Sequence, residues 1–467
     1  MKKITAILFI FLSCKTFAQD SLQQLNLQQF LQIVKTFHPV AKQSKIIVDK
    51  AAASLTVQRG AFDPVISGGG NDKTFDGTLY YRGNSTRLTI PTWYGIEVQT
   101  GIEYLAGSRN DPQETAGKTS FAGIGLPLAK NLLMDKRRAA LQQAKIMQQA
   151  SEAEQKIILN DLLMDAADAY WQWVQSWLAY KTWTQLIDVN RRRFSLVTAA
   201  YRNGDRPAID TTEALAQLQQ FEYLQNDAFL NWQNAGVQLS GFLWNSDNLF
   251  YNLPAAVVPS EKPEQLYDAV VFPELEQLLA LAKNNHPELA VYHFKLNALQ
   301  VERKLKFQEL LPRLDLKYNQ LGKGYDIAST AVKTMFNNNY KYGVSFSMPL
   351  RLSAGRGEYK LAKLKITETA LQQNQKQADV LNKIKKYYNQ LVNYKAQVSL
   401  LQKNYTAFLQ LQKGEETKFF NGESSLFMVN SRENKTQEIL LKLIDAAVKY
   451  NKTAAGLQWA AGNLWQG

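Results

Sequence analysis

The chain has 467 residues, 54 of them lysine or arginine and 41 aspartate or glutamate, which gives a formal net charge of +13 at pH 7. Such a chain can meet anionic lipid head groups or acidic partners, although general solubility explains the charge equally well. No nucleic-acid recognition motif is present, which argues against a nucleic-acid-binding protein. After the N-terminus, no segment has the roughly 18 unbroken apolar residues of a membrane-spanning helix.

The N-terminus has the pattern of a secretory signal peptide. A charged start (residues 1–3) precedes a short apolar run (residues 4–12) and a small residue, Ala18, at the expected cut. We therefore predict cleavage after Ala18, with a buried N-terminal helix as the alternative. Cys14 could be a lipid-attachment site, but Phe11 is unusual three places before such a cysteine. Without the signal no cysteine is left, so stability must come from packing or assembly.

The two halves of the chain repeat the same order of signals. A short amphipathic helix ends at His38-Pro39, a second helix follows, and Phe62-Asp63-Pro64 opens a strand-like stretch. In the second half, His286-Pro287 and Leu311-Pro312 hold the same places, and the offsets 286 − 38 and 312 − 64 are both 248. Two landmarks at one offset indicate a duplication, and two copies are too few for a solenoid.

Alternation of apolar and polar residues marks the strands. It is strict over residues 341–348 and clear over residues 96–104 and 313–320. The first-half insert, residues 64–127, holds up to four strand-like pieces, whereas the second half has two strands. Lipid does not tolerate an open sheet edge, so several chains must share one barrel if these strands span a membrane. A soluble antiparallel sheet packed on a core is the alternative.

Long polar helices follow each strand region. Residues 128–203 and 355–421 contain no proline after Pro127 and Pro349 respectively, and unbroken they would each be roughly 100 Å long. We expect each run to break somewhere. The pairs Asn203-Gly204 and Asn421-Gly422 then allow a tight reversal, and return helices follow. Each half is therefore predicted to be a long helical hairpin whose closed end carries Asn-Gly.

This arrangement resembles the outer-membrane efflux protein (TolC) family. The resemblance rests on the duplicated halves, on the prolines between strands and helices, and on Tyr201-Arg202-Asn203-Gly204 and Phe420-Asn421-Gly422. It implies a mainly α fold with a transmembrane β part. Duplicated long helical hairpins would form a periplasmic α-barrel, and each chain would give four strands to a trimeric, twelve-stranded outer-membrane β-barrel. The strand–helix junction residues are Pro64, Pro127, Pro312 and Pro349.

The domains implied are a signal peptide (1–18), a first repeat (19–252), a linker (253–273) and a second repeat (274–467). The first repeat has strands at about 63–127 and a helical hairpin at about 128–245; the second has strands at about 312–349 and a helical hairpin at about 355–464.

The resemblance implies a passive exit duct of a tripartite efflux or type I secretion system. The homotrimer would sit in outer-membrane lipid with its helices in the periplasm. A periplasmic adaptor (membrane fusion) protein would dock at the helical tips, and an inner-membrane pump of the RND or ABC type would supply the energy. Charged residues just after the tip turns constrict the pore in this family. The tip and gate residues that match here are the turn glycines Gly204 and Gly422, together with the charged residues Asp205, Arg206, Asp210, Glu213 and Glu423.

The two tip turns differ in charge. The positions after Gly422 that correspond to Arg206, Asp210 and Glu213 are Ser424, Met428 and Ser431, so only Glu423 is charged there. The resemblance therefore does not carry over cation selection at that turn. Three-fold symmetry would bring three copies of each tip residue around one axis, where charged rings set the field. We hypothesise that Arg206 and Asp210 form inter-helix pairs that hold the tip closed; ordinary solvated turn residues are the alternative.

Catalytic and cofactor chemistry is not indicated. The three histidines show no ligand spacing, so no metal site is predicted, and no cofactor-binding or hydrolytic motif is present. We predict a channel rather than an enzyme. A soluble periplasmic coiled-coil scaffold or adaptor is the main alternative, and an outer-membrane enzyme with a helical arm is a further one.

Overall fold

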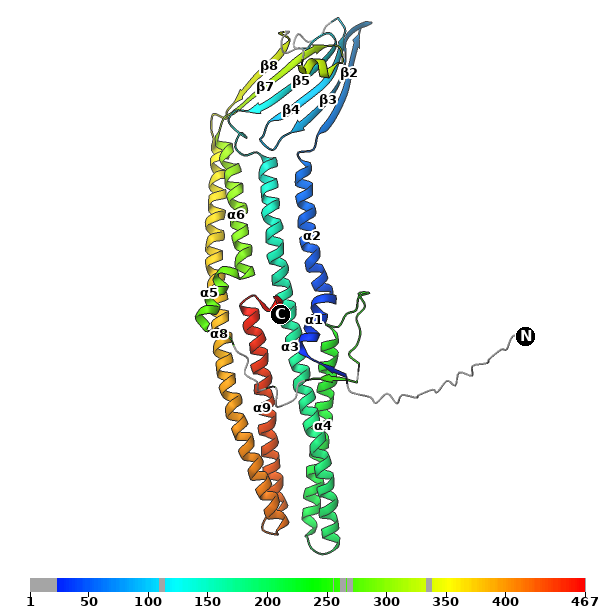
Figure 1. The fold of residues 1–467 in the computed structure, drawn as a ribbon, viewed down its shortest axis with the longest axis vertical. Coiled ribbons are helices and arrows are strands. Elements are labelled where there is room, and N and C mark those ends of the chain that lie inside the picture. The colour runs from blue at the N-terminus through cyan, green and yellow to red at the C-terminus, as the bar shows by residue number, and fades with distance from the viewer. Residues whose placement is uncertain are drawn as a thin grey trace, which may run out of the picture.

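The computed structural model describes residues 23–108, 114–254, 256–260, 266, 272–332 and 338–466. A sheet stands at one end of a column of long helices, and two turns close the opposite end (Figure 1). The predicted signal peptide with Cys14 and parts of the predicted linker lie outside the described residues. In the part of the chain that is described, no helix combines the length and apolarity needed to cross a bilayer.

Two pairs of helices below the sheet occupy matching places in the two halves. His38 separates the first pair and His286 the second, and each ring Nδ1 accepts the backbone N–H two residues further on, at 3.2 Å. A proline follows each histidine at the first helical position, where no N–H is needed. The pairs are α1 (Leu27–Phe37) with α2 (Pro39–Gly60), and α5 (Leu275–Asn285) with α6 (Pro287–Phe307).

The column is built on two very long helices, α3 (Lys136–Arg202) and α8 (Ser353–Phe420). Each is continuous, so the expected break is wrong. They have 67 and 68 residues, which at 1.5 Å per residue is about 100 Å. Neither contains proline, and partners support α3 along its length, because α2 and α6 contact it near the sheet. Further down, the return helices α4 (Ala208–Ser240) and α9 (Leu426–Ala460) take over.

The main apolar core lies near the middle of the column, where the return helices end. Phe30, Tyr170 and Trp173 have no exposed surface there. A two-stranded parallel sheet of β1 (Gln23–Leu25) and β6 (Val257–Pro259) covers this region. The Tyr170 hydroxyl donates to the Leu25 carbonyl at 2.8 Å and so ties the sheet to α3. The core therefore anchors the upper ends of the two hairpins, which extend from it to the turns at the opposite end of the column (Figure 1).

The large sheet has six strands and not the four implied by the family resemblance. All strand-like pieces of the first-half insert are strands of one sheet, ordered β2-β3-β4-β5-β7-β8, with every neighbouring pair antiparallel. A short helix, α7 (Ile327–Val332), precedes β8. The strands are β2 (Val65–Phe75), β3 (Thr78–Pro91), β4 (Glu97–Ala106), β5 (Gly117–Pro127), β7 (Arg313–Lys323) and β8 (Tyr340–Ser347).

The strand register puts apolar side chains of all six strands on one side of the sheet, which we call the apolar face. On β8, Tyr342, Val344 and Phe346 are 68, 60 and 68% exposed, although they are large and apolar. The opposite, polar face carries contacts such as the 2.8 Å hydrogen bond between Gln99 and Asn319. The apolar face comprises Ile66, Leu88, Ile90, Val98, Ile102, Ile124, Leu126, Leu314, Leu316, Tyr318, Tyr342, Val344 and Phe346.

Each of the four prolines lies where a strand meets the helical column. Pro64 and Pro312 directly precede β2 and β7, Pro127 is the last residue of β5, and Pro349 follows β8 by two residues. Proline cannot donate to a strand ladder, so it limits pairing at these places. The loop after Pro127 is fixed to the second half by an ion pair of 2.5 Å between Lys130 and Glu309 of the other repeat.

Candidate functional site at the tip of the helical hairpins

The tip consists of two turns, residues 203–207 and 421–425, with the helix ends that they join. Gly204 and Gly422 have φ angles of +82° and +80°, a region that favours glycine. The N–H of the next residue reaches back to a carbonyl of the preceding helix, at 2.9 Å in the first turn and 2.8 Å in the second. Both turns therefore end their helices in the same left-handed cap.

Arg206 connects the first turn to the second hairpin. Its guanidinium lies over the ring of Phe419 at 4.1 Å from the centroid, and Nη2 donates to the Phe419 carbonyl at 2.9 Å. Its ion pair with Asp210, at 3.8 Å, stays within the start of the first return helix. The hypothesis of an inter-helix Arg206–Asp210 pair is therefore corrected: Arg206 bridges the hairpins, but through Phe419.

A small cluster of apolar side chains packs together at the tip, next to Arg206. Phe419 is 8% exposed and Leu426 is fully buried. Val197 and Ala214 come from the first hairpin, and Val429 joins Phe419 and Leu426 from the second. Because the cluster draws on both hairpins, the two turns are held together inside a single chain.

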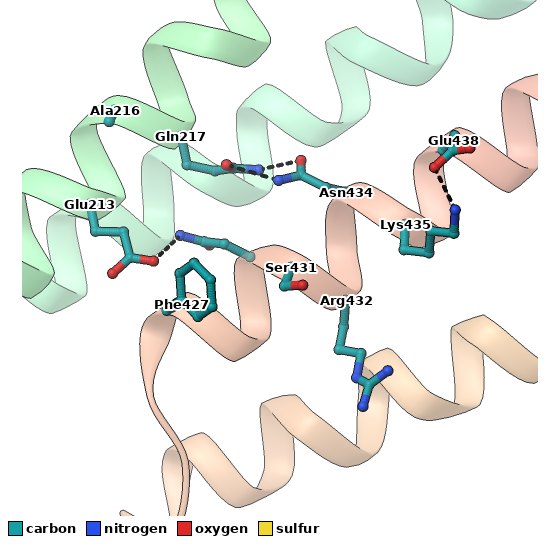
Figure 2. A pocket seen from close by; sticks show the side chains of 10 residues that line it. Glu213, Ala216, Gln217, Phe427, Ser431, Arg432, Asn434, Lys435 and Glu438 are labelled. Atoms are coloured by element: carbon teal, nitrogen blue, oxygen red, sulfur yellow. Dashed lines mark hydrogen bonds and ion pairs between the residues drawn. The ribbon is translucent and has the colours of Figure 1, made fainter.

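Above the cluster, polar side chains join the two return helices. Asn430 donates to a carboxylate oxygen of Glu213 at 3.4 Å. One helical turn further, Gln217 and Asn434 exchange two amide hydrogen bonds, of 2.7 and 3.3 Å. Figure 2 shows Gln217 and Asn434 pointing toward each other across the groove between α4 and α9. The spacing of four residues on both helices keeps the contacts on facing sides.

A buried ion pair lies behind this row. Arg193 of α3 donates to both carboxylate oxygens of Glu433 on α9, at 2.8 and 3.1 Å. Asn190 adds a third donor at 3.2 Å. The Glu433 side chain is 1% exposed and that of Arg193 13%. A two-pronged contact of this kind satisfies a carboxylate that burial would otherwise penalise heavily.

Glu213 has a perturbed acidity. Partial burial raises the pKa of its carboxyl group, and the neighbouring negative charge of Asp210 raises it further. The hydrogen bond from Asn430 opposes both effects, because it stabilises the charged form. The ionised form of Glu213 therefore lowers the stability of the folded tip.

The second turn carries its charge differently. Glu423 is exposed at the turn, as Asp205 is in the first. Glu415 faces inward along α8, where Ser424 donates to it at 2.5 Å and Arg432 lies 3.8 Å away. The acidic group that the second hairpin holds near its turn thus comes from the helix before the turn.

The structure brings together some of the predicted tip residues and adds others. Arg206, Asp210 and Glu213 share one side of the first hairpin, facing the second. Asp205 and Glu423 lie on the exposed turns. Sequence reasoning missed the pair of Arg193 and Glu433, because partners 240 residues apart leave no local pattern.

The chemistry available at the tip is that of charge and hydrogen bonding. In the described ranges no group of three or more potential metal-binding side chains is found. The row of polar contacts between α4 and α9 can be opened without breaking the long helices, because each contact joins separate helices. The tip is thus built as two rigid hairpins joined by separable side-chain links.

Comparisons with known proteins agree with this architecture. A family model described as outer membrane efflux protein matches residues 278–463. No curated protein sequence matches the chain. Among solved structures, the outer-membrane channel CmeC of Campylobacter jejuni is similar with a TM-score of 0.64 and 14% identity, over 94% of this chain and 86% of that one.

Two further solved structures are similar over nearly the whole chain. The outer membrane protein VceC of Vibrio cholerae has a TM-score of 0.63 and 12% identity, with coverage of 94% of this chain and 96% of that one. The Neisseria gonorrhoeae outer-membrane channel MtrE, solved in an open state, has a TM-score of 0.60 and 13% identity, with coverage of 94% and 89%. The family match thus covers residues 278–463 of the second half, and the likeness to these solved outer-membrane channels shows that the chain has their fold over nearly its whole length.

Proposed function

We propose that this chain is one subunit of a homotrimeric exit duct, which carries substrates from the periplasm and an inner-membrane pump across the outer membrane. One observation carries the proposal: a six-stranded sheet with an apolar face and two open edges stands on helices about 100 Å long. The sheet fits lipid only if sister copies close it, because unpaired backbone groups are not tolerated there. The helices then continue the conduit into the periplasm.

The apolar face fits a bilayer in its details. Transmembrane barrels carry an apolar band between two aromatic girdles. Here Trp93 and Tyr94 are 52 and 78% exposed in the turn between β3 and β4, next to the helical column. Tyr340 and Tyr342 lie on β8 toward the other end of the strand. The polar face would line the water-filled pore.

The tip is the proposed regulated end of the duct. Around a three-fold axis, three copies of each return helix would surround one opening. Asp205 and Glu423 would then form charged rings at the rim, and Glu213 a ring further in. The links between α4 and α9 hold the hairpins of one chain together, so opening the tip would require these links to separate or to move as a unit.

The duct has no energy source of its own in this proposal. A periplasmic adaptor protein would dock at the helical tips and connect them to a pump of the RND or ABC type. The proposal covers tripartite efflux and type I secretion alike, and it assigns no catalytic step and no cofactor to the chain.

The proposal is tested by purifying the mature protein and reconstituting it in a planar lipid bilayer. We expect extraction only with detergent, a heat-stable trimer on SDS gels, and channels of low resting conductance. The Asp210→Ala trimer tests the tip separately, because removal of this carboxylate from beside Arg206 and Glu213 should change the resting conductance. A water-soluble monomer without lipid affinity would refute the proposal and support the soluble scaffold instead.

A further inference from the structure

The six strands of the chain form one continuous sheet, with β2 at one edge and β8 at the other. We infer that β8 of one copy pairs with β2 of the next, so that three copies of the six-stranded sheet close a barrel of eighteen strands. The inference rests on the proposed trimeric function and specifies how one copy recognises another. Barrel diameter grows roughly linearly with strand number, so the outer pore would be about half again as wide as one of twelve strands.

The two additional strands are long enough to span a bilayer. A transmembrane strand needs about 9–11 residues. β2 has 11 residues and β3 has 14, compared with 10 in β4 and 11 in β5. The hairpin of β2 and β3 is therefore as long as the strands beside it and is not a short extramembrane hairpin.

The edge of β4 is not free to meet a sister copy. Residues 82–91 of β3 pair with residues 97–106 of β4 over the whole length of β4. The other edge of β3 is in turn covered by β2. A barrel made only of β4, β5, β7 and β8 would have to strip β3 from this ladder. Within the described residues, the strands with no neighbour on one side are β2 and β8, which Figure 1 shows at opposite edges of the sheet.

Chain direction allows the two open edges to pair. β2 follows α2 and runs away from the helical column, whereas β8 precedes α8 and runs back toward it. Copies related by rotation about the pore axis therefore place these strands antiparallel, as all other neighbours in the sheet are. The apolar face also continues onto the hairpin through Ile66, Leu88 and Ile90. Two charged side chains on that face, Asp72 and Arg82, neutralise each other in a 2.6 Å ion pair.

The stagger of the sheet predicts the register between copies. Ile66 leads across the ladders through Leu88, Thr100, Ala122 and Gln320 to Tyr340. Ile66 is one residue from the end of β2 that faces the helical column, and Tyr340 is seven residues from the corresponding end of β8. This row of paired residues therefore moves away from the column by six residues between β2 and β8.

A climb of about one residue per strand is the stagger of a closed barrel. Eight strands with a shear of eight tilt by about 36°, within the roughly 35–45° of transmembrane barrels. If the column ends of the strands stay level around the ring, residues at equal height meet at the junction between copies. Phe346 of β8 and Ile66 of β2 are each one residue from the column end of their strands. Level column ends, to within the stagger of about one residue per strand, set the register, and the covered edge of β4 sets the strand number.

Cross-linking with introduced cysteines distinguishes the two closures. Cys14 is the single cysteine of the sequence and lies in the predicted signal peptide, so introduced thiols would be unique in the mature chain. The test variant is Ile66→Cys with Phe346→Cys. The matched control is Val98→Cys with Phe346→Cys, because Val98 is also one residue from the column end, but on β4. Val98, Ile66 and Phe346 are 38, 74 and 68% exposed, so their replacement disturbs no packed core.

The intact trimer, in detergent, is treated with a short bismaleimide that tolerates a small register shift, and then run on a denaturing gel. We expect the Ile66/Phe346 variant to move from monomer to covalent trimer, while the Val98/Phe346 variant and the three single variants remain monomers after boiling. The inference would be overturned if only the Val98/Phe346 variant gave covalent trimer, or if neither double variant did. Either result would leave the proposed duct intact. Failure of the native protein to form a trimer at all would overturn both.

Discussion

The buried ion pair between Arg193 and Glu433 offers the sharpest test of how the tip is held. In the variant Arg193→Met, Glu433 would keep one of its three side-chain donors, the amide of Asn190. Removing one partner of a buried pair costs about 3–5 kcal/mol, because the remaining charge is left without compensation. At roughly 1.4 kcal/mol per tenfold change, local opening of the tip should become at least about a hundredfold more frequent.

Amide hydrogen exchange of the intact protein measures this opening. We expect faster exchange in α3 and α9 around Arg193 and Glu433, with unchanged exchange near the sheet. The double variant Arg193→Met with Glu433→Leu removes both charges and should recover most of the loss, since apolar replacements of buried pairs are often neutral or stabilising. Unchanged exchange in the single variant, or a double variant as open as the single one, would refute the reasoning.

Two further predictions concern the turn and its acidity. Gly204→Ala should destabilise the first turn by about 1–2 kcal/mol. The positive φ alone causes this cost, because a Cβ at residue 204 meets no atom within 4 Å. The matched control is Gly414→Ala inside α8, which also introduces no clash and should not speed amide exchange at the turn. The pKa of Glu213 is raised in the folded tip, so ionisation of this group destabilises the folded tip. This destabilisation is absent below the ordinary glutamate pKa of about 4.3 and is complete once the pH has risen past the raised pKa. Acidification from pH 7 should therefore slow tip exchange more in the wild type than in Glu213→Gln, and equal responses would contradict this.

Local sequence signals were enough to predict the strands and helices and the turns and prolines at which they end. The alternation before Pro349 predicted β8, and Asn-Gly at residues 203–204 and 421–422 predicted the turns. These features follow from the dihedral limits of proline and glycine and from the periods of strand and helix, all of which act within a few residues. The matched His-Pro pairs likewise marked equivalent helix caps, because the capping contact reaches only two residues along the chain.

The strand count needed the tertiary structure. Gly68, Gly69 and Gly70 give β2 little side-chain alternation, so the sequence could not tell a spanning strand from an extracellular loop. The ladder with β3 decides the matter, because it pairs the backbone of this stretch irrespective of side chains. The expected break in the long helices was wrong for a related reason: lateral packing keeps a helix continuous, and that packing is not visible in its own sequence.

By itself, the sequence determined the duplicated order of strands and hairpins, the turns that close them, and the acidic and basic residues placed there. Only the tertiary structure decided which charges meet. Arg206 sits over Phe419 and Arg193 holds Glu433 because two helical hairpins pack at one particular rotation about their axes. That rotation is set by many apolar contacts summed along the column, so the pairing of residues over 200 positions apart cannot be read from either partner's neighbourhood.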